Sequence, residues 1–176
     1  VMRETPGRPI LMIVNNSGQK LSLWDELMGN NGFVAHLGKC LDQARRQGHR
    51  IVGIVHEQAV SAGFMATGMS TDRCYSLPDA ELRLMAASAM SRVTRIPEAR
   101  LEELFRTSPI LGPGVCNFVR IGGLYGLLEG DIRQQVIKAF EAADAEEDAR
   151  LALGRERGGR MYAAEIAAMV RAGLSG

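Results

Sequence analysis

The sequence has few of the residues that mark disulfide-bonded or metal-binding proteins. Aromatic residues make up 5% of the 176 positions, and there are only three histidines and three cysteines. The cysteines (Cys40, Cys74 and Cys116) form no C-x-x-C pair, and the histidines share no metal-binding spacing with one another or with carboxylates. This pattern argues against a disulfide framework and against a zinc site, so we expect no metal.

The chain also lacks an excess of charge and a long apolar run. With 21 Lys and Arg against 20 Asp and Glu, the formal net charge is +1, which argues against nucleic acid as the principal partner. The longest apolar runs, Ile10–Val14 and Ile51–Val55, are far shorter than the ~20 residues that span a bilayer. We also expect no export signal. We expect a soluble, cytoplasmic protein with no membrane partner, folded as one domain over residues 1–176.

The first third of the chain predicts a βαβ unit. Ile10–Val14, bounded by Pro9 and a turn, is typical of a buried strand, and Ile51–Val55 predicts a second one. Between them the spacing predicts a helix over Phe33–Gln47, with one apolar face made of Phe33, Leu37, Cys40, Leu41 and Ala44. Such a unit implies parallel strands whose carboxyl ends meet at one edge, where ligands gather in α/β proteins. Because a domain rarely opens on a central strand, we expect further residues before Val1.

Small residues follow the second strand and predict a tight turn into a helix. They stand at positions 59, 61, 62 and 63, and a helix beginning there would aim free backbone N–H groups into the cleft at the strand ends. Two short extended pieces are expected at 73–76 and 81–85, and helices at 98–105, at 132–143 behind an Asp131 cap, and at 160–172. The last helix is expected to point Tyr162, Ile166, Met169 and Val170 inward, within a helical C-terminal region over about residues 131–176.

Several ordered segments resemble one known family. They are Arg8–Gln19, Arg45–Arg50, Ala59–Phe64, Leu77–Glu81, Arg92–Pro97 and Arg100–Leu104. Together they resemble the gamma subunit of biotin-independent malonate decarboxylase, from about residue 8 to the end. That family belongs to the crotonase superfamily and is similar to the alpha half of acetyl-CoA carboxylase carboxyltransferase. The resemblance implies an α/β crotonase fold of repeated ββα and βαβ units, with its N-terminal part missing from this chain.

The resemblance also implies a reaction and partners. In it, a malonyl thioester on an acyl-carrier subunit becomes an acetyl thioester and CO2, so the chain would be part of a carbon–carbon lyase that acts only as a heteromeric complex. The expected partners are a homologous beta-type subunit, as a heterodimer, and the acyl carrier. The carrier would hold a phosphopantetheine-type prosthetic group derived from dephospho-CoA, and this chain would bind no cofactor itself.

The resemblance implies a site made mainly of backbone. Crotonase folds offer two backbone N–H groups to a thioester oxygen, one from a loop after a strand and one from a glycine-rich helix start. The expected donors in this chain are Gly18, Gln19, Ala62 and Gly63, which would stabilise either the enolate oxygen or the departing carboxylate, with Ser17, Ser61 and His56 as substrate-binding residues. The family is richer in glycine near the helix start, so the N–H of Ala62 serves only if φ there is negative.

Other functions are weighed against this one. The two glutamates of crotonase hydratases fall here at Met65 and near Met85, which argues against hydration. Ser61 as a nucleophile with His56 as its base would make a hydrolase, but no orienting acid is evident. A biotin-dependent carboxyltransferase subunit and a structural partner without chemistry remain open.

Overall fold

A parallel sheet organises the computed structural model, which describes residues 3–18, 22–108, 112–143 and 148–173. Within these residues the strands are β1 (Ile10–Asn16), β2 (Ile51–Val60), β3 (Arg73–Ser76), β4 (Glu81–Arg83) and β5 (Gly126–Leu127). Four of them lie in the order β1-β2-β3-β5, and β4 pairs with the far end of β2. All pairs are parallel. The predicted parallel α/β arrangement is confirmed.

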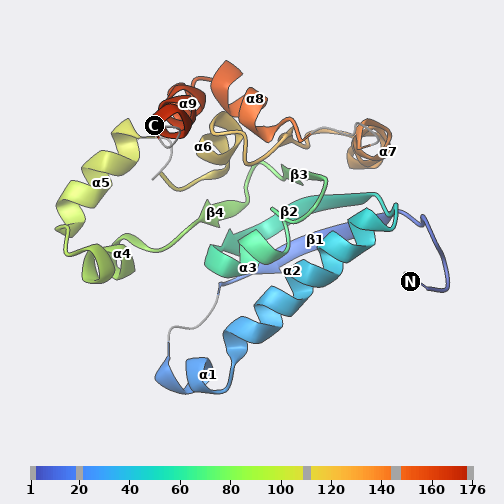
Figure 1. Cartoon of the computed structure of the whole chain (residues 1–176), viewed down its shortest axis with the longest axis horizontal. Coiled ribbons are helices and arrows are strands. Elements are labelled where there is room, and N and C mark those ends of the chain that lie inside the picture. Colours follow the sequence, from blue (N-terminus) through green and yellow to red (C-terminus); the bar gives the residue numbers. More distant parts are fainter. Residues whose placement is uncertain (1–2, 19–21, 109–111, 144–147, 174–176) are drawn as a thin grey trace.

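Helices cover both faces of this sheet (Figure 1). They are α1 (Leu23–Leu27), α2 (Asn30–Arg46), α3 (Ser61–Ala66), α4 (Ala87–Thr94), α5 (Glu98–Thr107), α6 (Val115–Arg120), α7 (Ile132–Ala142), α8 (Arg150–Glu156) and α9 (Ala163–Gly173). Helices α2 and α3 lie on one side of the sheet, and α6 to α9 lie on the other. The pair α4 and α5 extends beyond the carboxyl end of β4.

The predicted βαβ unit is formed by β1, α2 and β2. The register pairs Ile10 with Ile51 and Val14 with Val55, and then slips, so that Asn16 lies opposite Ala59. Strand β2 is longer than predicted, because it continues past Val55 to Val60 and gains β4 as a neighbour there. Both strands therefore end at one edge, and β4 ends beside them.

Apolar side chains on β2 hold the layers together. Leu41 and Ala44 of α2 pack with Ile51 on one side. On the other side, Val52 packs against two alanines at the carboxyl end of α7. The main cluster gathers around Phe64 of α3, whose ring meets the Phe118 ring edge-on at 5.6 Å between centroids. The core thus fixes α3 against the carboxyl half of the sheet.

Strand β1 is not the buried strand that its apolar run predicts. Among the described residues it pairs only with β2, so it is an edge strand. Val14 is buried, but Ile13 points away from the core and is 58% exposed. The predicted apolar face of α2 is also only half right: Leu41 and Ala44 are buried, whereas Phe33 is 75% exposed, because the first half of the helix runs past the sheet (Figure 1).

The C-terminal region confirms the predicted elements but not their packing. Helix α7 begins where expected, and the Asp131 carboxylate accepts a hydrogen bond from the Gln134 N–H at 3.1 Å. Helix α9 also forms, but the prediction that its apolar residues point inward is wrong. All four of them are more than half exposed: Tyr162, Ile166, Met169 and Val170. A 3.6-residue periodicity predicts an amphipathic helix, but it does not provide a surface to cover the apolar face.

Candidate functional site

Two asparagine side chains tie the carboxyl end of β1 to that of β2. The Asn16 Oδ1 accepts a hydrogen bond from the Val60 N–H at 3.2 Å. One residue earlier, the Asn15 amide donates to the Glu57 carboxylate at 2.8 Å. These bonds lie where the register between the strands slips, so side chains replace the regular ladder there. The two strand ends are therefore held together at one rim, as the βαβ pattern predicts.

The turn after β1 lies directly against the end of β2. Gly18 has a φ of +87°, and a Cβ at this position would lie 3.0 Å from Val60 Cγ1 and 3.3 Å from the Val60 carbonyl oxygen. Only glycine fits both the backbone conformation and the space. Ser17 and Gly18 share a cavity of about 200 Å³ with Val60 and Ser61. The two segments predicted to form the site thus converge.

The first turn of α3 also approaches the end of β1 closely. A Cβ at Gly63 would lie 2.6 Å from Asn16 Oδ1, the atom that accepts the Val60 hydrogen bond. A larger residue here would push the helix away from the strand. Glycine at position 63 therefore sets how near the helix start lies to the rim.

The backbone turns sharply between β2 and α3, at Ser61. Ser61 has a φ of +55°, a conformation that costs free energy for a residue with a Cβ. Ala62 is not among the residues with a positive φ, so its φ meets the condition under which its N–H can serve as a donor. The N–H groups of Ala62 and Gly63 lie in the first turn of α3, where backbone N–H groups have no acceptor within the helix itself. Such donors can hydrogen-bond an oxygen that gains negative charge.

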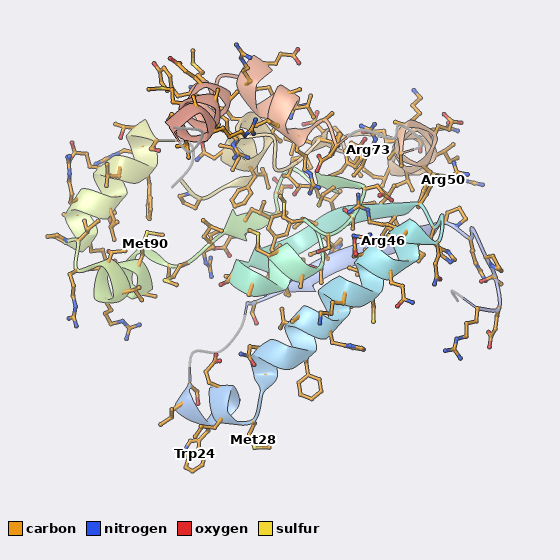
Figure 2. The ribbon with its side chains drawn as sticks, viewed as in Figure 1. Trp24, Met28, Arg46, Arg50, Arg73 and Met90 are labelled. Atoms are coloured by element: carbon orange, nitrogen blue, oxygen red, sulfur yellow. The ribbon has the colours of Figure 1, made fainter. Side chains whose placement is uncertain are left out.

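A second, apolar cavity adjoins the first. It has a volume of about 420 Å³ and shares Ser61, Leu84 and Met85 with the 200 Å³ cavity. Its other walls come from α3 and α4, and Figure 2 shows Met90 on α4. Both positions where hydratases carry glutamates lie here as methionines, Met65 and Met85. The wall beside the Ser61 and Ala62 amides can exclude water, but it offers no carboxylate for proton transfer.

The predicted site residues do not all meet. Ser17 and Ser61 line the 200 Å³ cavity, whereas His56 lines neither cavity. The His56 side chain is 52% exposed, and its Nδ1 lies 3.9 Å from the Glu57 carboxylate. Gln19 lies outside the described residues.

Arg83 is a cavity residue that the sequence pattern did not single out. It is the last residue of β4, and its register partner is Val60, the last residue of β2. It lines the same 200 Å³ cavity as Gly18 and Ser61. Its position follows only from the pairing of β4 with the carboxyl half of β2. The prediction that the second strand ends at Val55 left no place for that pairing.

The described residues offer neither a metal site nor an activated thiol. They contain no group of three or more potential metal ligands, and no helix among them is long and apolar enough to cross a membrane. Burial raises the pKa of the Cys74 thiol to about 12, so this core residue stays protonated and is a poor nucleophile. The candidate site is therefore the rim of backbone N–H groups with its two cavities.

The comparison with protein families decides the identity of the chain. The family model of the malonate decarboxylase gamma subunit matches residues 1–174. The chain belongs to this family. A relative from Malonomonas rubra, a malonyl-S-ACP:biotin-protein carboxyltransferase, is 33% identical over 181 residues, which cover 94% of this chain. The chain spans 62% of the length of that relative.

Solved structures agree on the fold of this malonate decarboxylase gamma-type chain. One of them is a chain of a Pseudomonas malonate decarboxylase hetero-tetramer in complex with coenzyme A. The match covers 97% of this chain and 70% of that chain, with a TM-score of 0.82 at 23% identity. A chain of the Pseudomonas malonate decarboxylase MdcD-MdcE hetero-dimer also matches. The match covers 97% of this chain and 69% of that chain, with a TM-score of 0.74 at 24% identity. The match to transcarboxylase 12S covers 80% of this chain and 28% of that chain, with a TM-score of 0.62 at 18% identity. These matches confirm the predicted crotonase-type α/β fold.

Proposed function

We propose that this gamma-type chain is one subunit of a malonate decarboxylase. In this complex it works beside a homologous beta-type subunit, as a heterodimer in the cytoplasm, on a malonyl thioester that an acyl-carrier subunit presents. The family match supports this proposal, as do the solved relatives described as malonate decarboxylase assemblies. The carrier would hold the thioester on a phosphopantetheine-type arm, and this chain would bind no cofactor of its own.

The reaction needs a place for negative charge. When the bond between the α-carbon and the carboxylate carbon breaks, CO2 leaves, and the electron pair of that bond stays on the α-carbon. This charge is delocalised onto the thioester oxygen as an enolate. A proton from water, added at the α-carbon, then completes the acetyl thioester. Preorganised N–H donors at the enolate oxygen lower the barrier, and removing one such donor typically costs ~10²–10³ in rate.

The observation that carries the proposal is the meeting of two N–H-bearing segments at one cavity. The assigned donors are the backbone N–H groups of Gly18 in the turn after β1, of Gln19, the next residue in the sequence, and of Ala62 and Gly63 at the start of α3. The close packing of Gly18 on Val60, and the position of Ala62 and Gly63 in the first turn of α3, support this assignment. Ser17 and Ser61 would contact the substrate beside them, and the apolar cavity would exclude water from the departing CO2.

The test is a bulky substitution in the reconstituted complex. Ala62 lines the apolar cavity, so Ala62→Leu should fill the space next to the donors and lower CO2 release from the malonyl carrier by at least ~10²-fold. The matched control is Ala99→Leu, which adds the same atoms to an exposed position of α5. Full turnover by an intact Ala62→Leu complex would make this chain a structural partner instead.

A second candidate is a biotin-dependent carboxyltransferase subunit. The name of the Malonomonas rubra relative, a malonyl-S-ACP:biotin-protein carboxyltransferase, favours it. The two functions differ in where the carboxyl group goes. In a decarboxylase it leaves as CO2 without biotin. In a carboxyltransferase it moves to biotin on another protein. Malonyl carrier labelled in its free carboxylate, incubated with and without a biotin carrier protein, distinguishes the two functions. Release of labelled CO2 without biotin indicates a decarboxylase, and label bound to biotin indicates a carboxyltransferase.

A further inference from the structure

The 200 Å³ cavity at the rim has one ionisable side chain among its described lining residues. The others are serine, glycine, valine, leucine, methionine and alanine, and the ionisable one is Arg83. Arg83 ends β4 opposite Val60, so it stands immediately beside the strained Ser61. Its side chain is 31% exposed, which leaves it sheltered but accessible from the cavity.

An acidic neighbour holds the arginine side chain. Glu81 lies two residues earlier on β4, on the same face of the strand, and its carboxylate forms an ion pair with the Arg83 guanidinium. The Glu81 side chain is 57% exposed, so water competes with this pair and makes it weak. A guanidinium can bind an incoming carboxylate through two parallel N–H donors, which Glu81 does not prevent.

We propose that Arg83 binds the free carboxylate of the malonyl group and selects malonyl over acetyl thioesters. The proposal rests on the proposed function, and it adds the residue that recognises the departing group. The backbone N–H groups at the rim suit an oxygen of either thioester, and they cannot tell a malonyl from an acetyl group. The distinction needs a cation at the carboxylate, and Arg83 is the cation that the cavity supplies.

The role has a kinetic signature. The contact between Arg83 and the carboxylate exists in the bound substrate, but it weakens as the carboxylate becomes neutral CO2. An interaction of this kind favours binding and does not accelerate the chemical step. Its loss should therefore raise KM and leave kcat unchanged or slightly higher. A residue that only shaped the cavity would lower kcat as well.

The experiment compares Arg83→Gln with wild type in the complex with the beta-type subunit. Two quantities are measured: the kcat and KM of CO2 release, and the Kd of the complex for malonyl carrier and for acetyl carrier. We expect KM and Kd for malonyl carrier to rise about 10- to 100-fold, with the Kd for acetyl carrier unchanged. Arg83→Lys keeps the charge and should recover part of the loss.

The matched control is Arg46→Gln. Arg46 lies on α2 (Figure 2), its side chain is 78% exposed and pairs with Asp42, and it does not line the cavity. It should leave every constant at the wild-type value. An Arg83→Gln complex that binds malonyl carrier as tightly as wild type overturns the inference, as does an equal loss for both carriers. If wild type releases no CO2, the proposed function fails, while the two Kd values still test Arg83.

Discussion

At the scale of single residues, the rim depends on how closely α3 approaches the end of β1. Gly63 makes that approach possible, because a Cβ there would meet Asn16 Oδ1 at 2.6 Å. Gly63→Ala should therefore displace Asn16, lose its bond to the Val60 N–H, and lower the free energy of unfolding by about 1–3 kcal/mol. Urea denaturation of the purified chain measures this change.

A second glycine gives the matched control for that substitution. Gly38 lies within α2, and the nearest atom to a Cβ there is Ser70 Oγ at 4.0 Å. Gly38→Ala removes backbone freedom from the unfolded chain without a clash, so it should stabilise the protein by about 0.5–1 kcal/mol. Equal effects of the two substitutions would mean that contact with Asn16 does not explain the glycine at 63.

A pH-dependent contribution is expected from Asp148. Its carboxylate binds the Arg150 guanidinium through two N–H groups, at 2.7 and 2.5 Å, and Arg150 also donates to the Met69 carbonyl. The hydrogen bond from Arg150 is the main reason that the pKa of Asp148 lies below its usual value. The stabilisation is therefore fully present above the pKa of the unfolded chain and disappears as the pH falls through the lower, folded pKa.

Asp148→Asn should accordingly destabilise the protein at pH 7 but have less effect near pH 3. The Asp148 side chain is 50% exposed, so the loss at pH 7 should stay below about 1 kcal/mol. Thermal unfolding across this pH range, with the exposed Asp79→Asn as control, measures it. A constant difference between Asp148→Asn and wild type at all pH values would contradict this assignment.

Sequence reasoning placed Gly18, Ser61 and Ala62 near one cavity because parallel strands end at one edge, a rule that needs no side-chain detail. It did not find Arg83, because that residue reaches the cavity through the pairing of β4 with the last residues of β2. It placed His56 at the site because the residue follows an apolar run. The strand continues through His56, whose side chain faces solvent.

At the scale of elements, α7 shows how a local signal fixes a helix start. Its N-cap, Asp131, accepts the Gln134 N–H at 3.1 Å, the geometry of an N-cap. Asp131→Ala should cost about 1 kcal/mol of stability, because that N–H loses its side-chain acceptor. Asp131→Ser keeps a side-chain acceptor, so it should lower the stability by only a few tenths of a kcal/mol. Urea denaturation of both variants tests this, and equal losses would show that the cap does not stabilise α7.

The helices that carry local sequence signals were therefore predicted well, but the surfaces against which they pack were not. Periodicity predicts α2 and α9 from the spacing of apolar residues alone. What such a face packs against depends on the rest of the assembly. The apolar stripe of α2 is buried where it crosses the sheet and exposed beyond it, and the stripe of α9 is exposed along its length. The edge position of β1 has the same origin, because strand order is a property of the whole sheet.

At the scale of the whole molecule, large apolar side chains are exposed at two separate ends. Helix α1 exposes Trp24, and its C-cap Met28 is exposed beside it (Figure 2), while α9 lies on the other side of the sheet (Figure 1) and exposes its apolar face. Exposed apolar surface of this extent usually marks contacts with other proteins. We expect the isolated chain to bind the apolar dye ANS and to self-associate as its concentration rises, measured by sedimentation velocity.

Adding the beta-type subunit should reduce both ANS binding and self-association if heterodimer formation covers these helices. A partner that binds only the folded chain stabilises it by mass action, by about 2.7 kcal/mol when its free concentration is 100 times Kd. We therefore expect ANS fluorescence to fall and the Tm to rise with partner concentration. Trp24 is the only tryptophan in the sequence, so quenching of its emission by iodide reports on α1 separately. A complex that forms with ANS binding unchanged would show that the apolar ends lie outside its interface.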